Sequence, residues 1–174
     1  MGGVTEGTHF PGLEVDVDDD HPIDHVVDLA QANAWEFDRV DGDRIEFVVE
    51  GQWRNYDVTM AWSRSDETLR LISSFAMDPP KGRHATLREL VGLANDLCWT
   101  GSFSFWPEHG SVAFRYGLLL AGGESATPVQ IHSMLVRSVC ACERFYPAFQ
   151  LAAWGDRAPE EALGIAIAEA YGHA

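Results

Sequence analysis

The spacing of apolar residues along the chain predicts four helices. Three segments have apolar residues three or four positions apart, which puts them on one side of a helix. A fourth, shorter segment ends before a glycine that suits a helix stop, Gly172. The segments are residues 22–34, 84–98, 128–146 and 159–171. Thr127 and Gln130 form a capping box that starts the third helix, and Pro147 predicts its end.

Between the helices, apolar and polar residues alternate, which is the pattern of strands with one buried face. Turn signals such as Asp41–Gly42 and His109–Gly110 separate the alternating runs. The runs are residues 35–40, 44–50, 53–62, 68–77, 99–106 and 111–120. Because the first four follow one another with short links, they predict an antiparallel four-strand meander, and the last two predict a hairpin.

The pattern as a whole predicts an α+β fold in the order α-ββββ-α-ββ-α-α. The helices are expected to pack on one face of an antiparallel sheet and to leave the other face comparatively open. A chain of 174 residues has the length of one domain with a core and short tails. We therefore expect residues 22–174 to form a single domain.

Residues 1–21 predict a disordered acidic tail. The first 28 residues contain eight Asp or Glu and no Lys or Arg, and aromatic rings are few. This segment has neither the basic start nor the apolar stretch of a secretory signal, so a cytoplasmic location is expected. The chain also has no run of about 18 apolar residues, which a membrane span would need.

The net charge of −15 argues against nucleic-acid and membrane partners. Phosphate backbones and anionic lipids are bound by clustered Lys and Arg, and this chain has 12 such residues against 27 Asp and Glu. A strongly acidic protein is better suited to a protein partner that has basic, unfolded stretches.

Cys140 and Cys142 lie close enough in sequence to suggest a metal or redox site, but their spacing favours a structural role. Two positions along a helix correspond to about 200° of rotation, so the two side chains point apart. Cys142 falls on the apolar stripe of its helix and is expected to be buried. Together with Cys98 the chain has three cysteines, too few for a disulfide framework.

The segment “DDDHPIDHVVD” is a second candidate metal site, because two histidines and two aspartates are each four residues apart. These residues are His21, His25, Asp24 and Asp28. His21 precedes Pro22 and is expected to lie outside the helix. The aspartates suit the positive N-terminal end of a helix without any metal. The structural interpretation is therefore favoured.

The chain has no local signature of catalysis or of cofactor binding. It has no phosphate-binding loop with a lysine, no Gly-x-Ser-x-Gly turn and no Gly-x-Gly-x-x-Gly after a strand. We therefore expect a protein that is not an enzyme and that holds no cofactor and no metal.

The tryptophans are expected to serve packing, with two exceptions. Trp35, Trp62 and Trp99 lie at the ends of strands, where large rings fill the edges of a layered fold. Trp53 and Trp106 have the opposite parity to the core residues of their strands. They are predicted to face the open side of the sheet and to anchor a protein partner. The alternative is that the acidic tail or a second subunit covers them.

Several segments give the chain a resemblance to a bacterial family. They are “AWEFDR”, “W-x(8)-W” over Trp53–Trp62, “FRYGLLLAGG”, “TPVQ”, “ACERFYPAFQLAAWG” and “PEEAL”. On these segments residues 22–172 resemble the YbjN-domain family, some of whose members are described as sensory transduction regulators. The resemblance implies an α+β fold similar to type III secretion chaperones, often dimeric. It assigns no catalytic residue, and the acidic tail lies outside it.

The predicted function is that of a non-enzymatic regulatory or chaperone-like domain. Its partner would be a protein segment, or a second copy of the chain in a homodimer, bound on the open face of the sheet or in a dimer groove. The rival hypothesis is a small-molecule sensor or an uncharacterised enzyme with a pocket between helix and sheet. An apolar patch would favour protein binding, whereas an enclosed cavity with converging histidines and acids would favour chemistry.

Overall fold

The computed structural model describes the backbone of residues 21–172 and the side chains of residues 21–168. The predicted disordered tail, residues 1–21, lies outside the described residues except for its last position. The elements in chain order are α1 (Pro22–Ala32), β1 (Phe37–Asp41), β2 (Arg44–Glu50), β3 (Asn55–Ser63), β4 (Thr68–Ala76), a short 3₁₀ turn (Lys81–Arg83), α2 (His84–Asp96), β5 (Ser102–Trp106), β6 (Ser111–Leu119), α3 (Pro128–Trp154) and α4 (Pro159–Gly172).

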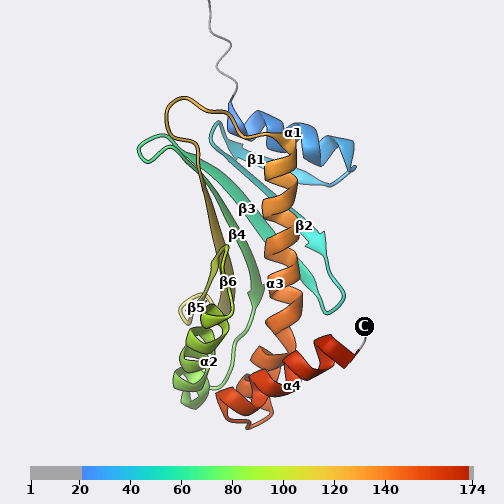
Figure 1. The fold of residues 1–174 in the computed structure, drawn as a ribbon, viewed down its shortest axis with the longest axis vertical. Helices are drawn as coiled ribbons and strands as arrows, with labels where there is room; N and C mark the ends of the chain where they lie inside the picture. Colours follow the sequence, from blue (N-terminus) through green and yellow to red (C-terminus); the bar gives the residue numbers. More distant parts are fainter. Residues whose placement is uncertain (1–20, 173–174) are drawn as a thin grey trace, which may run out of the picture.

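The six strands form one antiparallel sheet in the order β1-β2-β3-β4-β6-β5. The four-strand meander is continued by the β5–β6 hairpin, with β6 inserted next to β4. Figure 1 shows that α3 runs along the length of the sheet, with α1 across one end and α2 and α4 at the other. The predicted α+β fold, with its order of elements and its helices on one face, is confirmed.

The core lies between the sheet and α3, as the alternation of the strands predicts. On β2, β3 and β4, residues of one parity are buried under the helices and residues of the other parity face the open side. The largest fully buried side chains of the strands are Ile45, Tyr56, Met60, Leu69, Leu71, Phe75 and Phe114. The middle of α3 is tied to β4 by a buried hydrogen bond of 2.9 Å between the hydroxyls of Ser73 and Ser138. This bond gives two polar groups within an apolar core a partner.

Pro147 does not end α3, contrary to the sequence-based prediction. The helix starts at the predicted capping box of Thr127 and Gln130 and continues through Pro147 to Trp154. A proline inside a helix costs about 3 kcal/mol because a hydrogen bond is lost and the ring crowds the preceding turn. Here the residues on both sides of the proline, Phe145 and Phe149 among them, are buried in the core. Their burial outweighs that cost and keeps the segment helical.

Candidate functional site

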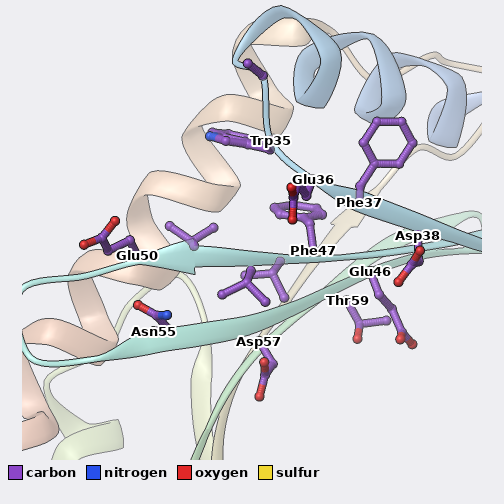
Figure 2. A pocket seen from close by; sticks show the side chains of 14 residues that line it. Trp35, Glu36, Phe37, Asp38, Glu46, Phe47, Glu50, Asn55, Asp57 and Thr59 are labelled. Atoms are coloured by element: carbon purple, nitrogen blue, oxygen red, sulfur yellow. The ribbon is translucent and has the colours of Figure 1, made fainter.

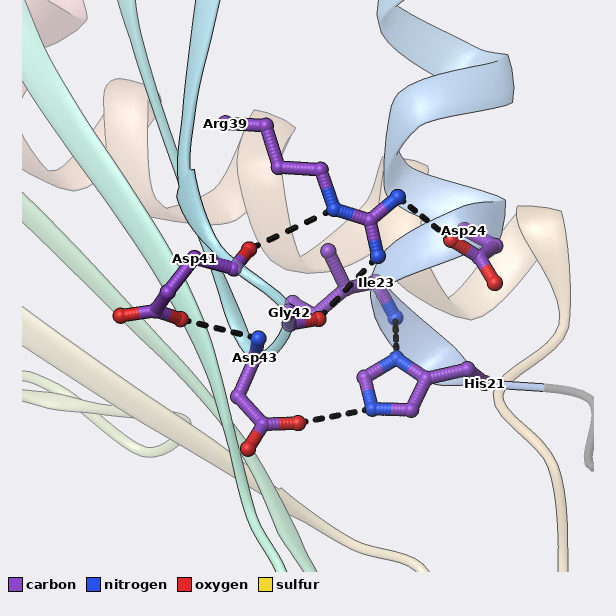
Figure 3. A network of polar contacts seen from close by, with 7 residues as sticks. All are labelled: His21, Ile23, Asp24, Arg39, Asp41, Gly42 and Asp43. Carbon is purple, nitrogen blue, oxygen red and sulfur yellow. Dashed lines mark hydrogen bonds and ion pairs between the residues drawn. The ribbon is translucent and has the colours of Figure 1, made fainter.

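Polar contacts join α1 to β1 at the end of the strand that leads into the β1–β2 turn. The imidazole of His21 accepts a hydrogen bond at Nδ1 from the backbone N–H of Ile23, which caps α1, and its Nε2 lies 2.8 Å from Asp43 of the β1–β2 turn. Arg39 of β1 donates to Asp24 at 2.8 Å and to the carbonyl of Gly42 at 3.1 Å. Figure 3 shows that these contacts join α1 to the hairpin end of β1.

The other end of the sheet edge formed by β1 is open, because β1 does not extend along the whole of β2. The pairing between the two strands stops at Phe37 and Phe47, and Val48–Glu50 pair with β3 alone. Beyond Phe37 the chain turns away, and the ring of Trp35 stacks on that of Phe47 with 5.5 Å between centroids. In Figure 2 the chain rises from Glu36 to Trp35 and leaves the end of β2 uncovered.

The backbone of the uncovered part of β2 points outward at defined positions. Gly51 donates to the carbonyl of Arg54 at 3.0 Å, and at the other end Trp62 donates to the carbonyl of Asp43 at 2.8 Å. In both bonds the residue on the β2 side, Gly51 or Asp43, has an odd number and points its peptide group toward β3. Because peptide groups alternate in direction along a strand, even-numbered residues point away from β3. The carbonyl of Val48 and both polar groups of Glu50 therefore face the open edge.

A hollow of about 860 Å³ surrounds this open edge. Its helix-facing wall is apolar, with Trp35, Phe47 and Val49 on one side of the strands. Its other wall is acidic and solvent-exposed. The exposed acids that line the hollow are Glu36, Asp38, Glu46, Glu50 and Asp57, of which Asp38, Glu46 and Asp57 lie on this wall. Figure 2 shows Asp38, Glu46 and Asp57 pointing to the side of β2 opposite Phe47. The hollow thus offers an apolar wall and an acidic wall to one bound segment.

Most of these acids have no cation of the protein beside them. Glu46 lies 3.8 Å from the guanidinium of Arg44. Within the described part of the chain, no Lys or Arg side chain forms an ion pair with Glu36, Glu50 or Asp57. The hollow therefore has an unbalanced negative charge that a cationic ligand would neutralise.

The turn that follows β2 is held on its α3 side by a partly buried polar pair, Tyr56 and Glu143. The hydroxyl of Tyr56 donates to Oε1 of Glu143 at 2.6 Å, and the N–H of Trp53 lies 3.4 Å from the same oxygen. Burial raises the pKa of Tyr56 far above its ordinary value, and the hydrogen bond to Glu143 raises it further. A side chain at Gly51 would clash, because its Cβ would overlap that carboxylate oxygen and lie 2.8 Å from the backbone carbonyl of Arg54. The position of the turn is therefore tightly defined.

Trp53 does not lie on the open face of the sheet, contrary to the placement predicted from parity. Strand β3 begins only at Asn55, so Trp53 belongs to the turn, and its ring stacks on Tyr146 of α3 with 6.5 Å between centroids. There it lines a second, apolar hollow of about 490 Å³ together with Trp154 of α3 and Ile165 of α4. The role of Trp53 as a partner anchor stays a prediction.

The other tryptophans divide between packing and exposure. Trp106 ends β5, is partly buried and meets His109 edge-on at 6.2 Å, and its role as a partner anchor also stays a prediction. Trp35 and Trp62 pack against the core as predicted. Trp99 does not, because its side chain is 98% exposed in the loop before β5. The alternating run predicted there begins three residues later, at Ser102.

The candidate reactive groups of the sequence are dispersed or buried. Cys142 is fully buried, and burial raises the pKa of its thiol, whereas Cys140 is exposed on another side of α3. His21 caps α1 from outside the helix, as predicted, and His25 lies 3.3 Å from the hydroxyl of Ser125. Among the described residues, no three His, Cys, Asp or Glu side chains are grouped as a metal ion would need. Nor does any described helix have the length and apolarity to cross a membrane.

The sequence did not reveal the open edge, although it contains the acids that line it. The alternation of acidic and apolar residues in “EFDR” and “EFVVE” predicted strands but not a binding site. What makes these acids a site is the point at which β1 stops pairing, and that point depends on register and not on composition. Trp154 was missed because α3 was expected to end before it.

Comparison with known proteins gives a family and a fold. Residues 22–151 match the family YbjN, described as “Putative bacterial sensory transduction regulator”. A chain of the crystal structure of the ExsC–ExsE complex is similar over 76% of this chain and 94% of its own, with 15% identity and a TM-score of 0.57. A chain of the HopA1–SchA chaperone–effector complex is similar over 72% and 92%, with 12% identity and a TM-score of 0.50.

YbjN from E. coli aligns over 87% of this chain and 92% of its own, with 11% identity and a TM-score of 0.49. Among curated proteins no sequence matches the chain. The similarity to the first two complexes confirms the predicted fold, that of type III secretion chaperones, and at these identities it concerns the fold alone.

Proposed function

The chain belongs to the YbjN family, and we propose that it acts as a non-enzymatic protein-binding domain, regulatory or chaperone-like in role. The partner contributes an extended basic segment, which binds in the acidic hollow beside β2 and adds a strand to the sheet. The observation that carries this proposal is the free edge of β2, where the carbonyl of Val48 and the peptide groups of Glu50 face the hollow. The similarity to chains from two protein complexes, one of them a chaperone–effector complex, supports it.

The chemistry of the hollow defines the segment. In a strand added beside β2, alternate side chains point to opposite walls. One set lies against Trp35, Phe47 and Val49 and is apolar, and the other set lies along the exposed acids and is basic. Main-chain hydrogen bonds supply affinity and the side chains supply specificity, as in other cases of strand addition. The segment we propose therefore alternates Lys or Arg with apolar residues.

The same acids argue against pairing of two copies edge to edge. Acidic side chains along an exposed edge oppose association of like edges, because the charges repel. A homodimer formed through another surface is compatible with the proposal. The rival function, a small-molecule sensor or enzyme, would be favoured by an enclosed cavity with converging histidines. The hollow beside β2 is instead an open surface without a histidine.

A pair of variants at Glu50 tests strand addition. Glu50→Pro removes both the charge and the outward N–H, whereas Glu50→Gln removes the charge alone. Proline is tolerated on a strand edge where the N–H faces outward, so both variants should fold. The probe is a synthetic peptide of alternating lysine and valine, about eight residues long, titrated by calorimetry into the full-length protein. We expect Glu50→Gln to weaken binding about two- to five-fold and Glu50→Pro to weaken it more than ten-fold.

Two further peptides separate the contributions of charge and backbone. A peptide with glutamate in place of lysine should not bind. The lysine peptide with N-methylated backbone at alternate positions should lose binding to the unaltered protein, which avoids any effect of a mutation on folding. Equal binding of Glu50→Pro and Glu50→Gln, together with binding of the N-methylated peptide, would overturn strand addition. Equal binding of the glutamate peptide would overturn the basic partner.

A further inference from the structure

The turn between β2 and β3 separates the acidic hollow from a second hollow of different chemistry. The second hollow has a volume of about 490 Å³ and lies between that turn, α3 and the middle of α4. Figure 1 shows the turn lying beside the lower half of α3. Its lining contains no charged side chain. The lining residues are Trp53, Pro147, Gln150, Leu151, Trp154 and Ile165, with Gly155.

Both tryptophans of this hollow keep large apolar areas in contact with solvent. Trp53 is 47% exposed and Trp154 is 54% exposed. Exposed aromatic rings that flank a recess are typical of sites where a partner places a large apolar side chain. The hollow has room for one leucine or aromatic side chain, and the absence of charge makes a basic side chain unsuitable there.

Residues that line the two hollows are neighbours in the sequence. Glu50 and Asn55 line the acidic hollow, and they flank the turn of residues 51–54 that carries Trp53. A segment that lies beside β2 and extends past Glu50 therefore arrives next to Trp53. Antiparallel pairing is the commoner arrangement of adjacent strands. In that arrangement the end of the segment that reaches Trp53 is its N-terminal end.

The wall formed by Trp53 is held in place before any partner binds. Its N–H and the hydroxyl of Tyr56 both lie against Glu143, and its ring stacks on Tyr146. The guanidinium of Arg54 lies 5.7 Å from the centroid of Tyr146, which adds a cation–π contact under the turn. A wall that is already ordered loses little conformational freedom on binding, so an apolar side chain placed against it gains affinity.

We infer that the partner segment has two parts: the basic strand, and a large apolar residue N-terminal to it that inserts between Trp53 and Trp154. This inference rests on the proposed function, since the strand brings the apolar residue to the hollow. It names the second determinant of specificity, which charge alone would not provide. An acidic surface attracts many basic segments, and the apolar site selects among them.

Peptides of two kinds test the inference on the full-length protein. The first is the lysine–valine peptide, and the others add a phenylalanine two or three residues before its N-terminus or after its C-terminus. We expect N-terminal phenylalanine to tighten binding about ten-fold, which corresponds to burial of one large apolar side chain, and C-terminal phenylalanine to have no effect. A stronger gain from the C-terminal position would overturn the orientation that we infer.

Three variants test whether the gain in affinity from the phenylalanine comes from the second hollow. Trp154→Ala should remove the gain from phenylalanine and leave binding of the lysine–valine peptide unchanged, and Trp53→Ala should do the same. Trp99→Ala is the matched control, because this ring is equally large and 98% exposed but lines neither hollow. Trp99→Ala should keep the gain. If Trp154→Ala keeps it too, the inference is wrong while the proposed function stands.

Two other outcomes are informative. If the lysine–valine peptide fails to bind in the first place, the proposed function and the inference fail together. If Trp154→Ala changes the sedimentation coefficient of the protein alone, the occupant of the second hollow is another copy of the chain, and the partner segment that we infer is wrong.

Discussion

The two ends of the edge formed by β1 and β2 differ in how they are held and in what they leave open. At the hairpin end, Arg39 connects β1 to Asp24 of α1, and His21 connects the start of α1 to Asp43 of the β1–β2 turn. At the other end β1 has left the sheet, and the turn is held on the α3 side by a partly buried hydrogen bond between Tyr56 and Glu143. The hairpin end is joined to α1 and pairs with β1, whereas the last residues of β2 have no β1 partner and offer their backbone to a partner segment.

This difference follows from where polar groups are placed relative to solvent. Exposed ion pairs are screened by water and salt and contribute little each, so several are used to hold the hairpin end. A partly buried hydrogen bond to a carboxylate, such as that from Tyr56 to Glu143, contributes more and does not cover the strand edge. The arrangement keeps the open edge in one shape without covering it.

Tyr56→Phe should have the largest effect on stability, because it breaks the support of the open end. The phenyl ring fills the same space, but the carboxylate of Glu143 keeps only the N–H of Trp53 at 3.4 Å as a partner within the described residues. Leaving a partly buried carboxylate without its hydrogen bond costs about 1–3 kcal/mol. Urea denaturation should show this loss. A loss below about 0.5 kcal/mol would mean that Glu143 is solvated in the native protein and does not hold the turn.

Alkaline pH should weaken the same region by a smaller amount. The ordinary pKa values are 9.0 for the thiol of Cys142 and 10.0 for Tyr56, and burial raises both in the folded protein. A group whose pKa is raised on folding stabilises the native state fully below its unfolded pKa and loses that contribution as the pH rises above it. The free energy of unfolding should therefore fall by about 1–2 kcal/mol between pH 8 and pH 10.

The double variant Tyr56→Phe/Cys142→Ala is the control for this pH dependence. It removes both groups, so its stability, although lower throughout, should change less over the same pH range. An unchanged slope in the double variant would assign the alkaline effect to other groups.

Arg39→Ala should have the smallest effect, at the hairpin end. The guanidinium and the carboxylate of Asp24 are 41% and 56% exposed, and exposed pairs contribute about 0.2–1 kcal/mol. The loss should shrink further in 1 M salt, because the pair is screened, whereas the loss caused by Tyr56→Phe should not. Thermal denaturation of both variants at low and high salt measures this contrast. A salt-independent loss of more than 2 kcal/mol for Arg39→Ala would contradict it.

The elements of the fold could be predicted from the sequence because each is set by local patterns. The alternation of apolar and polar residues predicted the strands, and the capping box at Thr127 predicted the start of α3. The errors occur where tertiary packing overrides a local signal. Pro147 normally stops a helix, but the aromatic residues around it are held in the core. Trp53 has strand parity, but the chain turns there and the ring packs on Tyr146.

The candidate site was less predictable, for a physical reason. Its acids are ordinary exposed residues of strands, and nothing in their spacing distinguishes them. They form a site because β1 stops pairing at Phe37 and the last residues of β2 remain uncovered. That length mismatch is a property of the assembled sheet. The negative charge of the whole chain indicated the chemistry of a partner but not its location.

Amide hydrogen exchange at Glu50, measured by NMR on the full-length protein with and without the lysine–valine peptide, tests the central claim most directly. The N–H of Glu50 faces the open edge, whereas those of Val49 and Gly51 face β3, and that of Gly51 bonds to Arg54 at 3.0 Å. We expect Glu50 to exchange faster than both neighbours in the free protein and to become protected when the peptide is bound, with Val49 and Gly51 little changed. A peptide that binds without slowing exchange at Glu50 would contradict strand addition at this edge.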